Sequence, residues 1–551
     1  MTLARYSDSQ KVDFAVVGSG AAGGVMAREL ARGGFDVVLF EQGPRLTPNQ
    51  FKHDELSHWF LSAITSDPIR NPQTFRADPN AKAVTRKTGR NPLWYARTVG
   101  GSSVHFTGNY WRFREIDFDE RSKLGDIAGT GFADWPISYA DLEPYYTKVE
   151  WEVGVSGLAG AHPGEPPRSK PYPMPPLPVK SSGVLFERGA RKLGLHPFPA
   201  PMAINSMLYR GRPGCGHCGF CHGFACEFTA KSSTLFNMIP EAEATGRCEV
   251  RPDSYVIRVE TNATGKASGV TYLDGKGKEH FQHARAVVVC ANGAETPRLL
   301  LMSASSRFPN GLANSSGLVG KYLMFNYSSR IGAVFEHELN EFKSVQVTRI
   351  LHDFYESDPK RGFYGGGGID ARIGPQPAVW ALRAAEEGPS WGAAYKARLA
   401  EFPRSVVFAG HSTSLPVATN SVSLDPQLKD AWGQPAIRVT YRDHPDDLKN
   451  ARFLQDRSVE IAEAAGDQKV MRGPIAEQDF SMHLLGTCRM GNDANTSVVD
   501  RNHRTHDVGN LFLCDGSSFV TSGRGQPTMT IQALAFRAAD QIGQFAKRGE
   551  I

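Results

Sequence analysis

The sequence contains no long apolar segment and few cysteines. No run approaches the ~18 apolar residues that a membrane-spanning helix needs, so we expect no membrane span. Residues 1–14 lack the apolar core of a secretory signal, and we expect no export signal on this chain. Eight cysteines in 551 residues are too few for the disulfide framework of a small secreted domain.

The chain also lacks a large excess of either positive or negative charge. The 62 basic and 57 acidic residues nearly balance, no basic run stands out, and we expect no nucleic-acid partner. Hydrophobic residues make up 40% of the chain and charged residues 22%, which is ordinary for a globular enzyme. A chain of this length predicts two domains or one large, elaborated domain.

A dinucleotide-binding signature lies near the N-terminus. An apolar run at residues 12–17 leads into GSGAAG, then a helical pattern, then a second apolar run that ends at Glu41. Gly18, Gly20 and Gly23 would let the backbone approach a pyrophosphate at the helix N-terminus, and Glu41 could accept a hydrogen bond from the adenosine ribose. The alternative is a chance glycine turn, and the signature alone does not separate FAD from NAD.

Three further blocks accompany this signature. They read RTVGGSSVHFTGNYWR at residues 97–112, AVVVCANGAETPRLL at 286–300, and HLLGTCRMG at 483–491 followed by NLFLCDGSSFVTSGRGQPTMTIQALAFRAAD at 510–540. Together with the N-terminal signature they resemble the glucose–methanol–choline (GMC) oxidoreductase family, in family order from residue 12 to about 540. The resemblance implies a flavoprotein, and it decides for FAD.

The family resemblance implies an α/β fold. A Rossmann-like FAD-binding domain is expected from the discontinuous segments 1–320 and 476–551, and a substrate domain with an antiparallel sheet from the inserted segment 321–475. Short β-like runs separated by turn signals at residues 249–289 agree with this organisation.

The resemblance also implies the catalytic residues. Oxidation of an alcohol by a flavin needs a base for the hydroxyl proton while hydride passes to flavin N5, and histidine suits that role near neutral pH. The family base falls on His483. The second family position, usually His or Asn, falls on Gln526, which cannot act as a base but can orient the hydroxyl. A one-residue shift in the alignment would bring Arg524 close to this position instead.

The FAD contacts implied by the resemblance are spread over the whole chain. His105 falls where some family members attach FAD covalently, whereas the alternative is that residues 100–109 contact the flavin through their backbone. The helix expected from residue 528 should point its N-terminus at the flavin, where it would stabilise negative charge. The expected cofactor-binding residues are Gly18, Gly20, Gly23, Glu41, Gly100, Gly101, Ser102, His105, Thr107, Asn109, Val256, Ala291, Asp515, Gly516 and Thr528.

Half of the cysteines lie in one short segment, within the range 211–235. Cys215, Cys218, Cys221 and Cys226 follow the spacing C-x2-C-x2-C-x4-C. Four thiolates at such spacing hold iron–sulfur clusters or zinc. In the resembling subgroup of bacterial sugar dehydrogenases (glucose, fructose, gluconate and glucoside 3-dehydrogenases) this region holds a cluster, so we expect a 3Fe–4S or 4Fe–4S centre. Zinc and a metal-free loop are the alternatives, and two histidines of the loop, His217 and His222, are possible ligands.

Three functions compete at this stage. The first is a dehydrogenase that oxidises a sugar or glycoside hydroxyl and relays electrons through the cluster to a cytochrome c or quinone. That reading implies a small partner subunit with the export signal and a periplasmic location, although a cytoplasmic enzyme is equally compatible. The second is an oxidase that produces hydrogen peroxide without a redox cluster. The third is a flavin-binding subunit with an inactive site, against which an intact His483 argues.

Overall fold

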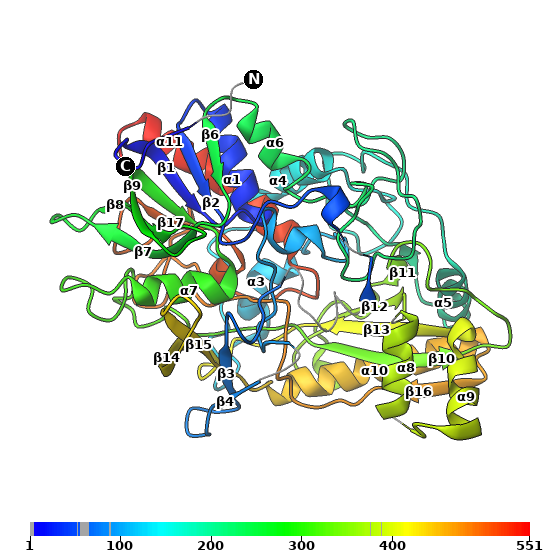
Figure 1. Ribbon diagram of the computed structural model, residues 1–551. Coiled ribbons are helices and arrows are strands. Elements are labelled where there is room, and N and C mark those ends of the chain that lie inside the picture. Colours follow the sequence, from blue (N-terminus) through cyan, green and yellow to red (C-terminus); the bar gives the residue numbers. More distant parts are fainter. Residues whose placement is uncertain (1–4, 52, 56–64, 87–89, 375, 387) are drawn as a thin grey trace.

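The computed structural model describes residues 5–51, 53–55, 65–86, 90–374, 376–386 and 388–551. Its strands form three sheets, of which the first two build the walls of the site described below. The C-terminus lies beside the first sheet, and the second sheet lies at the opposite end of the molecule (Figure 1). Among the described residues, no helix is both long and apolar enough to cross a membrane.

The first sheet has the order β6-β2-β1-β9-β8-β7, with β17 also paired to β9. Its parallel part contains β1, β2, β6, β17 and the C-terminal half of β9, and its antiparallel part contains β7, β8 and the N-terminal half of β9. Strands β1 and β2 are almost continuously apolar because a parallel sheet is covered on both faces. The bounds are β1 Val12–Val17, β2 Val37–Phe40, β6 Cys248–Arg251, β7 Tyr255–Thr261, β8 Ala267–Leu273, β9 Glu279–Val289 and β17 Leu511–Leu513.

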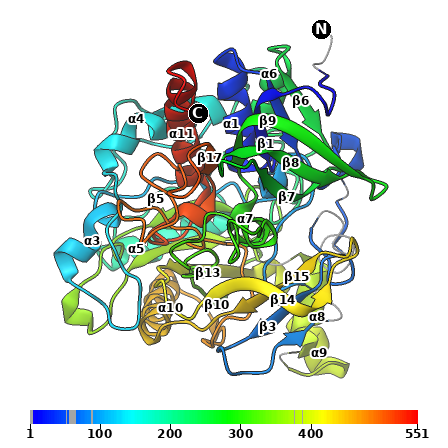
Figure 2. The same ribbon diagram turned by 90° about the vertical axis from the view of Figure 1, so that its left-hand side faces the viewer.

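Helices cover both parts of this sheet. Helix α1 packs against α11 and α6, α4 packs against α11, and α7 contacts β7 (Figure 2). The apolar side chains of α1, α11 and the strands form the largest core cluster of the protein. The bounds of these helices are α1 Ala21–Arg32, α4 Tyr139–Val153, α6 Met238–Glu243, α7 Asn292–Met302 and α11 Thr528–Lys547.

The second sheet is antiparallel throughout, with the order β16-β10-β13-β12-β11-β5. One face packs its apolar side chains against helices α5 and α10. The residues that alternate with these along each strand point to the opposite face of the sheet. That face is turned toward the first sheet. The bounds are β5 Phe198–Pro199, β10 Ser328–Val334, β11 Val347–Leu351, β12 Gly367–Arg372, β13 Ser405–Ser412, β16 Lys469–Arg472, α5 Ser181–Lys192 and α10 Pro445–Ala465.

The third sheet has the order β14-β15-β3-β4 and packs on α7. Its strands are β3 Gln73–Arg76, β4 Val84–Thr85, β14 Ser421–Lys429 and β15 Pro435–Thr440, and the remaining helices are α3 Ile116–Leu124, α8 Pro377–Glu386 and α9 Gly392–Ala400. The expected fold class is confirmed, with a Rossmann-like unit and an antiparallel sheet. Strands β3, β4 and β5 come from before residue 321, and the domain boundaries at 320 and 475 stay a prediction.

Candidate active site

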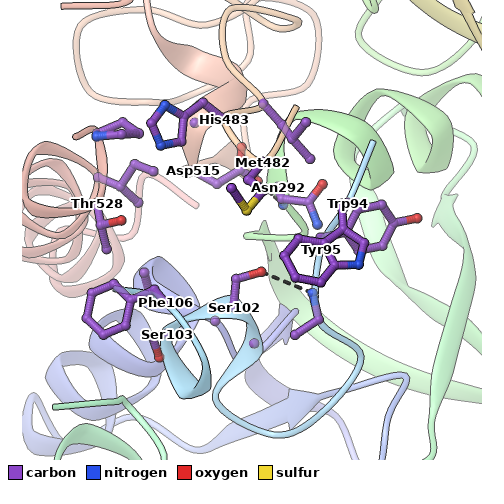
Figure 3. A pocket seen from close by; sticks show the side chains of 18 of the residues that line it. Trp94, Tyr95, Ser102, Ser103, Phe106, Asn292, Met482, His483, Asp515 and Thr528 are labelled. Atoms are coloured by element: carbon purple, nitrogen blue, oxygen red, sulfur yellow. Dashed lines mark hydrogen bonds between the residues drawn. The ribbon is translucent and has the colours of Figure 1, made fainter. Parts of the chain in front are cut away.

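One large cavity of about 320 Å³ lies between the first and second sheets. In the close-up view, Trp94 and Tyr95 lie on one side of it and Thr528 on the other (Figure 3). The predicted site residues that line the cavity are Gly18, Gly20, Glu41, Gly101, Ser102, His105, Thr107, Asn109, Val256, Ala291, His483, Asp515, Gly516, Gln526 and Thr528. Segments far apart in the sequence therefore meet at one site.

Two predicted cofactor residues do not line the cavity, and both have a supporting role instead. A Cβ atom on Gly23 would lie 1.7 Å from the carbonyl oxygen of Gly18, so the turn requires glycine at this position. Gly100 has a φ of 96° and its backbone N–H donates to Ser19 Oγ at 3.0 Å, which fixes the neighbouring loop. Gly18, with a φ of 93°, does line the cavity.

Glu41 lies at the carboxyl end of β2, where the dinucleotide signature places an acid. Its carboxylate accepts hydrogen bonds from Ser19 Oγ at 2.7 Å, Ser19 N at 3.2 Å and Gly43 N at 3.1 Å. Burial raises the pKa of Glu41, and these hydrogen bonds oppose the rise. The hydrogen bonds orient the carboxylate at the cavity wall, where it can accept from a ribose hydroxyl.

The loop after Gly100 forms the wall beside Trp94. Ser102 Oγ accepts a hydrogen bond from the Ala96 N–H at 3.0 Å, which holds this loop against the preceding segment (Figure 3). His105 is buried, and the edge of its ring contacts Trp94 with 5.1 Å between centroids. Covalent attachment of FAD at His105 stays a prediction.

Asp515 joins the C-terminal motif to the first sheet. It accepts hydrogen bonds from Thr296 Oγ1 at 2.6 Å, Ser517 N at 2.7 Å and Asn292 N at 3.0 Å. Burial raises the pKa of this carboxyl, and the hydrogen bonds oppose the rise. The same segment ends at Thr528, the first residue of α11, so the positive end of this helix dipole borders the cavity.

His483 faces the cavity as a neutral ring with a defined tautomer. Its Nδ1 lies 3.2 Å from Oδ1 of Asn326. The Asn326 amide nitrogen donates to the carbonyl oxygens of Ser412 at 3.1 Å and Gly523 at 3.3 Å, so its oxygen must face the imidazole. Nδ1 of His483 therefore carries the proton and Nε2 has a free lone pair. Asn326 was missed by the sequence analysis because nothing local marks it.

Burial lowers the pKa of His483 to about 4, and the nearby His411 and Arg372 add to this effect. Only the neutral ring can accept a proton. The base is therefore in its active form above about pH 4, far below the ordinary histidine value.

This environment makes a prediction about pH. The rate constant kcat/KM for flavin reduction should be level between about pH 5 and 8, because His483 does not titrate there. In Asn326→Asp, a carboxylate would stabilise the protonated ring and move the acid limb upward by about 1 unit or more. Anaerobic stopped-flow measurements of flavin absorbance across pH test both. A wild-type acid limb near the ordinary histidine pKa would contradict the prediction.

Gln526 also lines the cavity, whereas Arg524 does not. The Arg524 guanidinium is buried, forms ion pairs with Asp117 and Glu120, and donates through Nε to the Tyr355 carbonyl at 2.8 Å. The alternative in which Arg524 takes the second catalytic position is therefore wrong, since its charge is fully used in a buried network.

The sequence analysis missed the contribution of the second sheet to the cavity. Strands β10, β12 and β13 present polar side chains there, and the missed lining residues include Ser328, Arg330, Gln346, Arg372 and His411. The available signal was the alternation of the strands themselves: GGIDAR places charged residues at every second position of an otherwise apolar strand.

The four cysteines of the 211–235 segment line a second, much smaller cavity of about 20 Å³. Burial raises the pKa of Cys215 to about 12 and also raises those of Cys218 and Cys221, so these three thiols are protonated at neutral pH. Within the described ranges, no three His, Cys, Asp or Glu side chains are placed to hold a metal ion.

Neither histidine of this segment is among the residues that line the small cavity, although the backbone N–H of His217 donates to Cys215 Sγ at 3.4 Å. His217 Nδ1 lies 2.6 Å from Ser344 Oγ, and His222 lines the large cavity. The buried Lys231 donates to the carbonyl oxygens of Cys221 at 3.2 Å, Phe224 at 2.7 Å and Phe106 at 2.6 Å. This ammonium group thereby ties the cysteine loop to the wall of the large cavity.

Comparison with known proteins agrees with this geometry. Residues 12–327 match the N-terminal part, and residues 416–535 the C-terminal part, of the GMC oxidoreductase family, and the chain belongs to this family. It is 35% identical to 2-methyl-1,2-propanediol dehydrogenase of Mycolicibacterium austroafricanum, over 98% of this chain and 96% of that protein. It is 31% identical to the fructose dehydrogenase large subunit of Gluconobacter japonicus, over 98% and 100% of the two chains.

Solved structures show the same fold. The chain superposes on pyridoxine 4-oxidase from Mesorbium loti with a TM-score of 0.62 at 17% identity, covering 96% of this chain and 98% of the other. The residues present fit FAD: a glycine turn without room for side chains, an oriented acid at the end of β2, and a helix N-terminus on the opposite wall. The protein is a FAD-dependent GMC oxidoreductase.

Proposed function

We propose that the protein is a dehydrogenase that oxidises a hydroxyl of a sugar or polyol. The observation that carries this proposal is the state of His483 in the cavity. Its ring is neutral, its Nδ1 holds a proton that is hydrogen-bonded to Asn326, and its Nε2 has a free lone pair that can accept a proton. When bound, FAD would supply the hydride acceptor for the carbinol carbon. His483 takes the hydroxyl proton at Nε2, and Gln526 donates or accepts a hydrogen bond that orients the hydroxyl.

We further propose that the four cysteines hold an iron–sulfur cluster and that the enzyme delivers its electrons to a cytochrome c or quinone. The donor set supports this: four thiols line one small cavity of almost entirely apolar surface. Structural zinc is the alternative occupant of the same four thiols.

The proposal also includes a partner subunit and a cellular location. One relative carries the name of a large subunit, which supports assembly with a smaller subunit in this protein too. We propose that this subunit carries the export signal and brings the enzyme to the periplasm, with the cytoplasm as the alternative. Copurification of a tagged chain, followed by fractionation of the source cells, would test both statements.

The test of the reaction is anaerobic reduction of the purified flavoprotein by a panel of sugars and polyols, followed by reoxidation with either oxygen or cytochrome c. A dehydrogenase should reoxidise rapidly with cytochrome c and slowly in air. Rapid reoxidation in air with stoichiometric peroxide would overturn the dehydrogenase and favour the oxidase. If no alcohol or sugar reduces the flavin, the proposed substrate class is wrong.

A further inference from the structure

The cavity face of the second sheet carries more positive than negative charge. In the register of the sheet, Arg330 on β10 and Asp370 on β12 both pair with Ala409 of β13, so their side chains share one face. Arg372 lies two residues beyond Asp370 and therefore on the same face. Two arginines and one acid thus share one face of the sheet, and both arginines line the cavity.

The negative charge of Asp370 is neutralised by Arg372. Arg372 donates to Asp370 through Nε at 2.6 Å and also through its terminal nitrogen. Nδ1 of His411 lies 3.5 Å from the same carboxylate. Although burial opposes ionisation, Arg372 and His411 lower the pKa of Asp370 to about 2, so the acid is ionised and the pair with Arg372 is neutral overall.

After Arg372 and Asp370 have neutralised each other, the positive charge of Arg330 remains. Its side chain lines the cavity and forms no hydrogen bond or ion pair with any of the described residues. Burial, with the nearby Arg372, Arg383 and Arg90, lowers the pKa of Arg330 to about 10, which leaves it charged at neutral pH. A half-buried cation without a counter-ion is costly unless a ligand supplies one.

Gln346 adds a second, independent feature of the same cavity. It is 1% exposed and lines the same cavity, and its Oε1 makes no hydrogen bond within the described part of the chain. A buried amide oxygen of this kind needs a donor, and a substrate hydroxyl is one. The cavity therefore offers places for an anionic group and for hydroxyl groups.

We propose that Arg330 binds an oxyanion of the substrate, a carboxylate or a phosphate, so that the natural substrate is an acidic polyol. The guanidinium fork suits either group because it can donate two parallel hydrogen bonds. This inference rests on the proposed function, in which His483 takes the proton of a substrate hydroxyl, and it deepens that function by naming the substrate class.

The experiment compares four linear polyols that differ at one end. D-glucitol is neutral, D-gluconate carries a carboxylate, D-glucitol 6-phosphate carries a phosphate, and 1-amino-1-deoxy-D-glucitol carries a cation. Each is used to reduce the wild-type holoenzyme, Arg330→Gln, Arg330→Lys and Arg330→Glu, with kcat/KM taken from anaerobic flavin absorbance. Gluconate binding to the oxidised holoenzymes is measured separately by calorimetry in the absence of an acceptor.

We expect Arg330→Gln to lower kcat/KM for the preferred acid by about 10- to 100-fold, through KM, and to change that for D-glucitol by less than about 3-fold. Arg330→Lys should recover part of the loss, and Arg330→Glu should favour the amino polyol. Preference for gluconate or for the phosphate ester identifies which oxyanion is bound. The matched control is Arg472→Gln on β16, whose guanidinium already pairs with the exposed Asp456.

Equal losses for the neutral and acidic polyols in Arg330→Gln would overturn the inference, since the arginine would then serve the reaction itself. If the wild type oxidises neutral polyols in preference to acidic ones, the inference about Arg330 is also overturned, but the proposed function stands. If no polyol reduces the flavin, the proposed function fails. The binding data still decide on Arg330: gluconate should bind the wild type and not Arg330→Gln, and equal binding to both would overturn the inference.

Discussion

Replacing His483 with asparagine is expected to slow substrate-dependent flavin reduction by about 10²- to 10⁴-fold. The asparagine side chain can still hydrogen-bond a substrate hydroxyl but cannot take its proton at neutral pH. The effect should therefore appear mainly in the rate constant for flavin reduction and much less in KM. Anaerobic stopped-flow measurement of flavin absorbance, with the substrate that reduces the wild type fastest, gives both values.

The control for this variant is His506→Asn. His506 is half-buried like His483, but its Nε2 is 2.9 Å from Ser497 Oγ and it does not line the cavity. Both variants should retain FAD and the wild-type circular dichroism spectrum. If His483→Asn keeps its FAD and reduces at more than about a tenth of the wild-type rate, the assignment of the base is wrong.

The second large effect concerns the cysteine loop. Cys221→Ser should remove iron, acid-labile sulfide and any paramagnetic signal, and it should reduce electron transfer to cytochrome c to background. Flavin reduction by substrate should continue, because His483 and the large cavity are untouched. Metal and sulfide analysis, electron paramagnetic resonance and separate assays of the two half-reactions measure these outcomes.

Cys248→Ala provides the matched control, since Cys248 is a buried thiol on β6 that does not line the small cavity. It should keep the iron content of the wild type. Wild-type protein purified anaerobically with FAD but without iron would contradict the cluster. Stoichiometric zinc in its place would support the structural zinc alternative, and peroxide formed from alcohols in air would favour the oxidase.

The sequence predicted the local parts of the site well, because short motifs report local chain geometry. The glycine turn after β1, the acid after β2 and the start of α11 all line the cavity where the motifs placed them. Gly23 and Gly100 show the limit of this reasoning, since a motif glycine can serve the turn and not the ligand. Motifs identify positions that matter without saying which atoms they contact.

The substrate side could not be predicted in the same way. Asn326 sets the tautomer of His483 from 157 residues away, and Arg330, Arg372 and His411 meet only through the pairing of three strands. The register of an antiparallel sheet is a tertiary property, so no short segment encodes which side chains become neighbours. The alternation within each strand was visible, but the face that turns toward the cavity was not.

The hydrogen bonds of Lys231 have a consequence for electron transfer. Because one buried ammonium holds carbonyl oxygens of both the cysteine loop and the wall of the large cavity, the spacing between the two sites is a property of the folded chain. Electron tunnelling slows steeply as the distance between donor and acceptor grows. In the proposed relay, a partner that docks on the exposed Cys218 side would set only the rate of the last step, while the rate of the first step would be fixed when the chain folds.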